Sequence, residues 1–327
     1  MSETTGIRDF PRRVHGAVRR VGDRFAGSPE SAAAAWGFLR PYVAAERRFA
    51  GRMMARGPFA AAGYEFLRFG MKQAWACLFG GIMLALLIAT HYWYPRDAAL
   101  ARYDFLFLAA LTVQAGLLAF RLETFEEAKV ILAYHIVGTV MEIFKTAQGS
   151  WIYPDPSFFH IGGVPLFTGF MYSCIGSYLC RAWRLFHLRF TGQPPLWALG
   201  LVSAASYANF FTHHYVVDLR LVLFAAAAAL LWRTRVYFVV WRKARWMPLL
   251  LGFVLIAAFI WFAENIGTYT RTWLYPGQRE AWTIVGLPKL GSWFLLVIIS
   301  FALVALIKRR DYQAREEGPA RDNRRAP

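Results

Sequence analysis

Two glutamates stand inside long apolar segments, where an ionisable side chain is costly. Glu142 and Glu264 each lie in such a segment, a short distance before its polar end. Carboxyl groups at this depth in a membrane usually face a cavity or a polar partner, and burial favours their protonated form. We therefore predict that both act as catalytic proton donors. The alternative is a structural carboxyl that is hydrogen-bonded to a neighbouring helix.

His135 is the third residue predicted to take part in catalysis. It precedes Glu142 by seven positions, so the two share one face of a helix. We expect it to relay a proton to Glu142. The corresponding position in the second half of the chain is Ala257, so we expect the first half to hold the working centre. The alternative is a neutral, buried histidine bonded to the backbone.

Further polar and aromatic residues lie near the same ends of the apolar segments and are predicted to bind substrate. They are His91, His213, Thr146, Thr268, Trp151, Tyr153, Trp273 and Tyr275. The tryptophans and tyrosines have a simpler alternative interpretation as an interfacial belt. No HxxxH or HxxE spacing supports a metal site, and no nucleotide-binding motif occurs, so we predict neither metal nor cofactor.

The composition indicates a membrane protein. Of the 327 residues, 57% are hydrophobic and 17% aromatic, and the mean hydropathy is +0.34. The apolar residues form blocks of the length that a helix needs to cross a bilayer. We predict an all-α membrane protein with about eight transmembrane helices, at 74–94, 104–121, 127–148, 163–183, 195–212, 216–232, 246–266 and 287–307.

The charge distribution predicts the orientation. The formal net charge is +17, and the excess lies mainly in the two tails and in alternate loops. By the positive-inside rule, we expect both termini to lie in the cytoplasm. No basic module of the nucleic-acid-binding kind occurs. Residues 1–72 form a basic, partly amphipathic region, which we expect to bind anionic lipid headgroups, with a solvated leader as the alternative.

A comparison of the chain with itself at an offset of 122 residues indicates an internal repeat. Rare residues match in clusters: Thr90-His91 falls on Thr212-His213, Glu142 on Glu264, Trp151 on Trp273, and Tyr153-Pro154 on Tyr275-Pro276. We predict two four-helix repeats, 73–190 and 191–310, followed by a disordered cytoplasmic tail, 311–327. An even number of crossings in each repeat makes the two repeats parallel.

Two motifs resemble the bacterial domain of unknown function 817 family. One runs from Glu142 through Trp151-Ile152-Tyr153-Pro154 to Gly163-Val164-Pro165, and the other from Glu264 through Trp273-Leu274-Tyr275-Pro276 to Gly286-Leu287-Pro288. The resemblance covers roughly residues 65–308. It implies a multi-pass protein of the bacterial inner membrane and brings no assigned activity.

A fainter resemblance is to membrane enzymes of carotenoid synthesis, the carotenoid hydratases and the heterodimer-type lycopene cyclases. Those enzymes also place a glutamate in a helix before an aromatic loop and a Gly-x-Pro turn, and they act by acid–base chemistry on polyenes. Phe125-Glu126-Glu127 matches their Pro-Glu-Glu motif only in part. The resemblance therefore implies only the acid role of Glu142 and Glu264.

Three functions remain open from the sequence. The first is an intramembrane acid–base enzyme acting on a lipid or isoprenoid. The second is a small-molecule transporter or exporter, which parallel repeats with polar residues between them would suit. The third is a structural assembly factor in which the carboxyls hold helices together. Membrane lipids are the expected partners, and the oligomeric state is left open.

Overall fold

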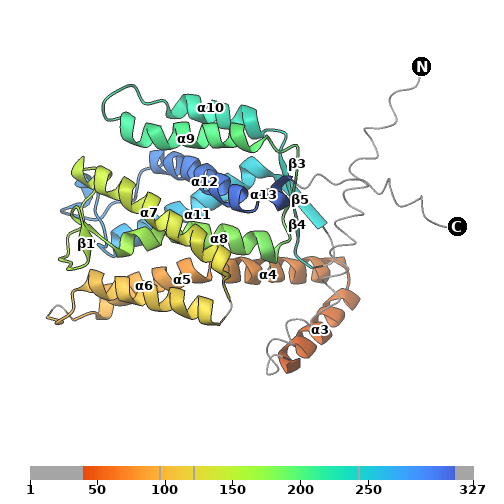
Figure 1. Ribbon diagram of the computed structural model, residues 1–327. Helices are drawn as coiled ribbons and strands as arrows, with labels where there is room; N and C mark the ends of the chain where they lie inside the picture. The colour runs from red at the N-terminus through yellow and green to blue at the C-terminus, as the bar shows by residue number, and fades with distance from the viewer. Residues whose placement is uncertain (1–39, 96, 121, 242–243, 314–327) are drawn as a thin grey trace, which may run out of the picture.

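The computed structural model describes residues 40–95, 97–120, 122–241 and 244–313, and it is mostly helical (Figure 1). Of the region 1–72 that we predicted to bind lipid headgroups, residues 1–39 lie outside the described residues, as does most of the predicted tail, 314–327. The two ends of the helix bundle differ. We call the end with the loops 148–166 and 270–287 the loop end, and the end with the strands β3, β4 and β5 the sheet end.

A helix coincides with each of the eight predicted spans. These helices are α5 Leu78–Trp93, α6 Arg102–Ala119, α7 Phe125–Ala147, α8 Phe167–Leu185, α9 Leu196–Thr212, α10 Arg220–Leu231, α11 Leu249–Tyr269 and α12 Pro288–Ile307. Among the described helices, four are long and apolar enough to cross a membrane, namely α6, α7, α11 and α12. Two of the remaining helices clearly do not meet this condition. α10 has only 12 residues, and α8 is less apolar because it contains Arg181 and Arg184.

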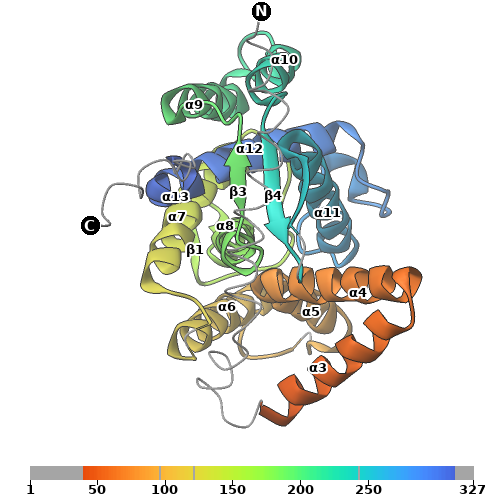
Figure 2. The ribbon, with the colours of Figure 1, turned by 90° about the vertical axis from the view of Figure 1, so that its right-hand side faces the viewer.

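The first predicted span is the second half of a bent pair of helices. α4, Pro58–Ala76, and α5 meet at Cys77 with a bend of 72°, and together they would make a fifth candidate span. A further helix, α3, Arg40–Ala55, precedes them. Figure 2 shows α3 and α4 lengthwise where α8 is seen end-on, so both lie across the sheet end.

Two small antiparallel sheets correct the all-α prediction. β1, His160–Ile161, pairs with β2, Val164–Pro165, and a second sheet has the order β3-β4-β5. Its strands are Arg189–Thr191, Arg235–Val239 and Ala244–Pro248. We predicted a loop between the spans that end at 232 and begin at 246, but the run Val236-Tyr237-Phe238-Val239 is β-branched and aromatic, which favours a strand. A short 3₁₀ turn, η2, Pro276–Gln278, and a short helix, α13, Arg309–Gln313, complete the described elements.

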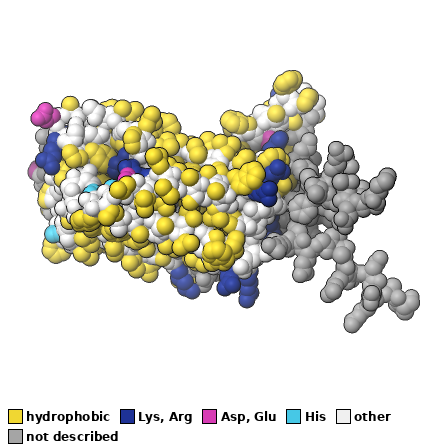
Figure 3. All heavy atoms as spheres, turned by 90° about the horizontal axis from the view of Figure 1, so that it is seen from above, with side chains coloured by type: hydrophobic (Ala, Val, Ile, Leu, Met, Phe, Trp, Pro, Cys, Tyr) yellow, Lys and Arg dark blue, Asp and Glu magenta, His cyan; other side chains and the backbone are white. Residues whose placement is uncertain are grey.

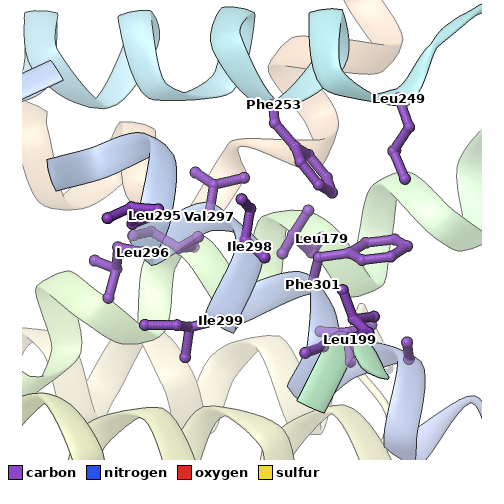
Figure 4. Close-up of a cluster of buried hydrophobic side chains, with 14 of the residues drawn as sticks. Leu179, Leu199, Leu249, Phe253, Leu295, Leu296, Val297, Ile298, Ile299 and Phe301 are labelled. Carbon is purple, nitrogen blue, oxygen red and sulfur yellow. The ribbon is translucent and has the colours of Figure 1, made fainter. Parts of the chain in front are cut away.

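The core lies around α8 and α12. Figure 4 shows Leu179 of α8, Leu199 of α9, Phe253 of α11 and Phe301 of α12 packed in one buried cluster. This packing holds the helices that carry the site, because α8 is also the main partner of α7.

The outer surface of the bundle is apolar. The most apolar stretch of α11 is only 22% buried, and Val254, Leu255, Phe259 and Phe262 are exposed on it. Hydrophobic side chains are spread over the whole described part of the face seen in Figure 3, and charged ones form a few separate groups. Exposed apolar area of this extent is typical of a surface that faces lipid.

Candidate functional site

Glu142 lies near the end of α7 and is enclosed by hydrogen-bond donors. It is only 4% exposed. Its Oε2 atom accepts hydrogen bonds from Trp151 Nε1 at 2.7 Å and from the Tyr153 hydroxyl at 2.5 Å. Its Oε1 atom accepts one from the Tyr172 hydroxyl of α8 at 2.6 Å. Three donors therefore meet one buried carboxyl group.

Two glycines make this arrangement possible. α7 ends at Ala147, and Gly149 then takes a positive φ of 68°, which lets the chain fold back so that Trp151 and Tyr153 reach the helix. Gly138 lies under Tyr172, and a Cβ atom there would come within 2.7 Å of the tyrosine ring. Tyr172 therefore reaches Glu142 by lying directly on the α7 backbone.

Glu264 of α11 has a matching environment. It is 6% exposed, and its Oε1 atom accepts hydrogen bonds from Trp273 Nε1 at 3.0 Å and from the Tyr275 hydroxyl. Gly267 gives Trp273 its space, since a Cβ atom there would lie 2.1 Å from the ring. In both segments the tryptophan follows its glutamate by nine residues and the tyrosine by eleven.

The two Trp-x-Tyr-Pro loops contact each other directly. Ile152 and Leu274 form an antiparallel bridge with two backbone hydrogen bonds of 2.9 Å. The Nζ atom of Lys289, at the start of α12, lies 4.7 Å from the centre of the Trp151 ring and 4.3 Å from that of Tyr275. We call the paired loops the clasp. Its cation–π contacts place one ammonium group between the two loops.

The donors fix the role of each carboxyl oxygen. An indole N–H can only donate, so Glu142 and Glu264 must accept from their tryptophans. Burial, and to a smaller extent the charge of the adjacent Glu142, raises the pKa of Tyr153 well above its usual value. Burial and the adjacent Glu264 do the same for the pKa of Tyr275. Both phenols therefore stay protonated and can share their protons with the carboxylates.

His135 lies apart from this hydrogen-bonded group. Its ring packs 4.6 Å from that of Phe170 and close to Gly169, where a Cβ atom would come within 2.3 Å of Nδ1. Its Nδ1 atom has no hydrogen-bond partner of standard geometry among the described residues. No described hydrogen bond joins it to Glu142, so a relay between them would need an intervening water molecule. The relay stays a prediction.

The other histidines make different contacts. His91 Nδ1 lies 3.1 Å from the Thr270 carbonyl. His213 and His214 both contact the buried Lys145, with their Nε2 atoms 3.2 Å and 2.9 Å from its Nζ atom. His213 Nδ1 lies 2.8 Å from the Asn209 carbonyl, which leaves its Nε2 free to accept from Lys145.

The two threonines predicted to bind substrate are not equivalent. Thr146 has a buried hydroxyl without a partner among the described residues. Thr268 accepts a hydrogen bond from Trp282 Nε1 at 3.1 Å and donates to the Asn265 carbonyl. Only the tryptophans and tyrosines of the predicted set therefore contact the glutamates.

Sequence reasoning missed Tyr172, Lys145 and Lys289. A lysine in the last turn of α7 and another at the second residue of α12 were signals, since a charge at either place needs a partner. Tyr172 gave no signal, because one tyrosine in an apolar helix is common.

A very small cavity lies beside the Glu142 group. It has a volume of about 10 Å³ and borders Tyr172, Tyr134 and Ser300, which is close to the least volume that holds one water molecule. Within the described ranges, no group of three or more His, Cys, Asp or Glu side chains is placed to hold a metal ion.

Comparison with known proteins places the chain among relatives without an assigned activity. The family model described as "Protein of unknown function (DUF817)" matches residues 65–301. The chain is 41% identical over 257 residues to "Uncharacterized protein YoaT" of Bacillus subtilis (strain 168), covering 79% of this chain and 95% of that protein. No solved structure matches.

Proposed function

Because the chain belongs to the DUF817 family, whose description assigns no activity, we propose its function from the site itself. We propose an acid–base enzyme of the bacterial inner membrane that acts on a lipid or isoprenoid. The observation that carries this proposal is the buried carboxyl of Glu142, bonded at 2.5 Å and 2.6 Å to the phenols of Tyr153 and Tyr172.

Such a centre can hold and release a proton without water. A proton on it is shared between the carboxyl group and the two phenols, which can each donate or accept. Glu142 delivers the proton to the substrate and is left as a carboxylate, which the two phenols stabilise by donating hydrogen bonds while they stay protonated. The carboxylate then takes a proton back from another position of the substrate, so the acid is restored at the end of the cycle. Glu264 with Tyr275 forms a second centre of the same kind across the clasp. The substrate enters from the lipid, because the exposed sides of α7 and α11 are apolar.

The membrane arrangement that we propose has eight crossings in two parallel four-helix repeats, with both termini in the cytoplasm. The bridge between Ile152 and Leu274 supports the repeats. These residues correspond at the offset of 122, and equivalent residues pair with each other only next to a two-fold axis. The basic α3 and α4, which lie across the sheet end, support contact of the N-terminal region with anionic headgroups.

The test compares lipid extracts by mass spectrometry from cells that lack the protein and from cells that express it or its variants. We expect Glu142→Gln to abolish a lipid product that the wild type makes, while the variant still inserts and folds. Glu280→Gln is the matched control, because Glu280 is exposed in the same loop region. Tyr153→Phe tests the role of the phenol: a loss of turnover with normal folding would assign its hydrogen bond to stabilising the Glu142 carboxylate after proton transfer. If the lipid composition is the same in all strains, the proposed enzymatic function is wrong.

Transport of a small molecule is the second candidate, and the clasp favours it. Paired loops close the loop end over two carboxyl groups and one ammonium, as an outward-closed gate would. This function predicts substrate flux in proteoliposomes that a cross-link between positions 152 and 274 stops. Flux that continues through the cross-linked protein would argue against gating by the clasp.

A further inference from the structure

Four side chains at the sheet end form two stacked pairs. The Arg233 guanidinium lies 4.8 Å from the centre of the Trp232 ring, and the Arg235 guanidinium lies 4.3 Å from that of Trp246. Trp232 is 66% exposed and Trp246 47% exposed, and both arginines are exposed as well. We call these four residues the arginine–tryptophan platform.

The backbone beneath the platform is held firmly. Gly192 takes a positive φ of 65°, and a Cβ atom there would lie 2.7 Å from the Arg233 carbonyl oxygen, so the two backbones are in close contact. The Thr234 hydroxyl donates to the Gly192 carbonyl at 3.0 Å, and the Leu249 N–H donates to the Thr234 carbonyl at 2.9 Å. The two arginines thus start from a fixed segment between β3 and α11.

The positive charges of the platform have no counter-charge in the described chain. Neither Arg233 nor Arg235 forms an ion pair with a described carboxylate. The neighbouring Arg245 differs, since it pairs with Glu65 of α4. A guanidinium stacked on an indole still presents its N–H groups at its edge, where they suit a phosphate.

The position of the platform indicates where that phosphate would come from. The apolar helix α10 ends at Leu231, directly before Trp232, and α11 begins at Leu249, shortly after Trp246. In a membrane-embedded chain this is the level of the lipid headgroups, where tryptophan and arginine are both favoured.

We propose that the arginine–tryptophan platform is a binding site for the phosphate of an anionic phospholipid. The two stacked guanidiniums hold the phosphate, and the tryptophans lie against the upper acyl chains. The proposal rests on the membrane embedding of the chain and is independent of the acid–base centre, so either can fail alone.

The test measures phosphatidylglycerol bound to the purified full chain in detergent by native mass spectrometry, with phosphatidylcholine as the neutral comparison. We expect the wild type to prefer phosphatidylglycerol and the double variant Arg233→Gln, Arg235→Gln to lose affinity about thirtyfold. The matched control is Arg309→Gln, Arg310→Gln, which removes two charges from exposed residues of α13 and should change affinity little. If the two double variants lose the same amount of affinity for phosphatidylglycerol, the platform is not a specific binding site.

Two further arms test the chemistry. Arg233→Lys with Arg235→Lys keeps the charge and removes the planar stacking, so a loss between those of the wild type and the glutamine variant is expected. Wild-type affinity in this variant would overturn recognition by stacked guanidiniums. Soluble glycerol phosphate should not displace the lipid, and efficient displacement would show that the platform binds free phosphate instead.

Discussion

Replacing Gly138 with alanine tests whether Tyr172 must lie on the α7 backbone to reach Glu142. The new Cβ atom would stand 2.7 Å from the tyrosine ring, with two further ring and Cβ contacts below 3.0 Å. The ring must therefore move outward, and its hydrogen bond to Glu142, 2.6 Å in the wild type, would lengthen or break.

The expected size follows from three contributions. Overpacking in a tight interior costs about 1–3 kcal/mol, and the lost hydrogen bond between the phenol and the protonated carboxyl group costs about 0.5–1.5 kcal/mol. Alanine regains about 1 kcal/mol of helix propensity. Because a ring that moves relieves part of the overpacking, we expect a net loss of about 2 kcal/mol in the free energy of unfolding.

Gly116→Ala supplies the control, since Gly116 also lies inside a helix but has nothing within 4 Å of the place that a Cβ atom would take. This change should leave stability the same or raise it slightly. Both variants would be compared by reversible unfolding in mixed micelles. If Gly138→Ala is as stable as Gly116→Ala, Tyr172 is not held against α7 in the way the structure shows.

Two further predictions concern buried and titrating charges. Arg181 and Glu123 form a fully buried ion pair at 3.4 Å. Arg181→Met leaves the Glu123 carboxylate without its counter-charge, so we expect the free energy of unfolding to fall by about 3–5 kcal/mol. The same micelle assay measures this change, and a loss below about 1 kcal/mol would contradict the prediction. Burial, then Lys145 and His213, lower the pKa of His214, so the unfolded chain takes up a proton first and stability should fall as the pH drops below about 6.5. His214→Gln should flatten that part of the pH profile, and an unchanged profile would exclude His214 as its cause.

The helices were predictable because apolar blocks and basic residues mark where each one starts and stops. α7 and α12 match the predicted spans 127–148 and 287–307 within a few residues. The number of membrane crossings was less predictable, because α10 has fewer residues than a helix needs to cross a bilayer. The bend at Cys77 was missed, since no proline marks it and the predicted span 74–94 runs across it.

Part of the site was predictable for a similar reason. Glu142 and Glu264 could be identified because a carboxyl group in an apolar helix is rare, and the repeated Trp-x-Tyr-Pro loops identified their hydrogen-bond donors. The position of Lys289 between Trp151 and Tyr275 could not be predicted. It depends on how the two loops pair in space, and a sequence offset gives no information on such pairing.

The pairing of Ile152 with Leu274 also makes the two carboxyl groups thermodynamically dependent on each other. Each bridging residue is flanked by the tryptophan and tyrosine that bind its own glutamate, so separating the bridge withdraws donors from both carboxyls at once. A ligand that binds at one glutamate and loosens its loop must therefore change the affinity for a ligand at the other glutamate. The coupling is reciprocal and has the same magnitude in both directions. Two sites joined in this way should bind their ligands as one coupled unit and not independently.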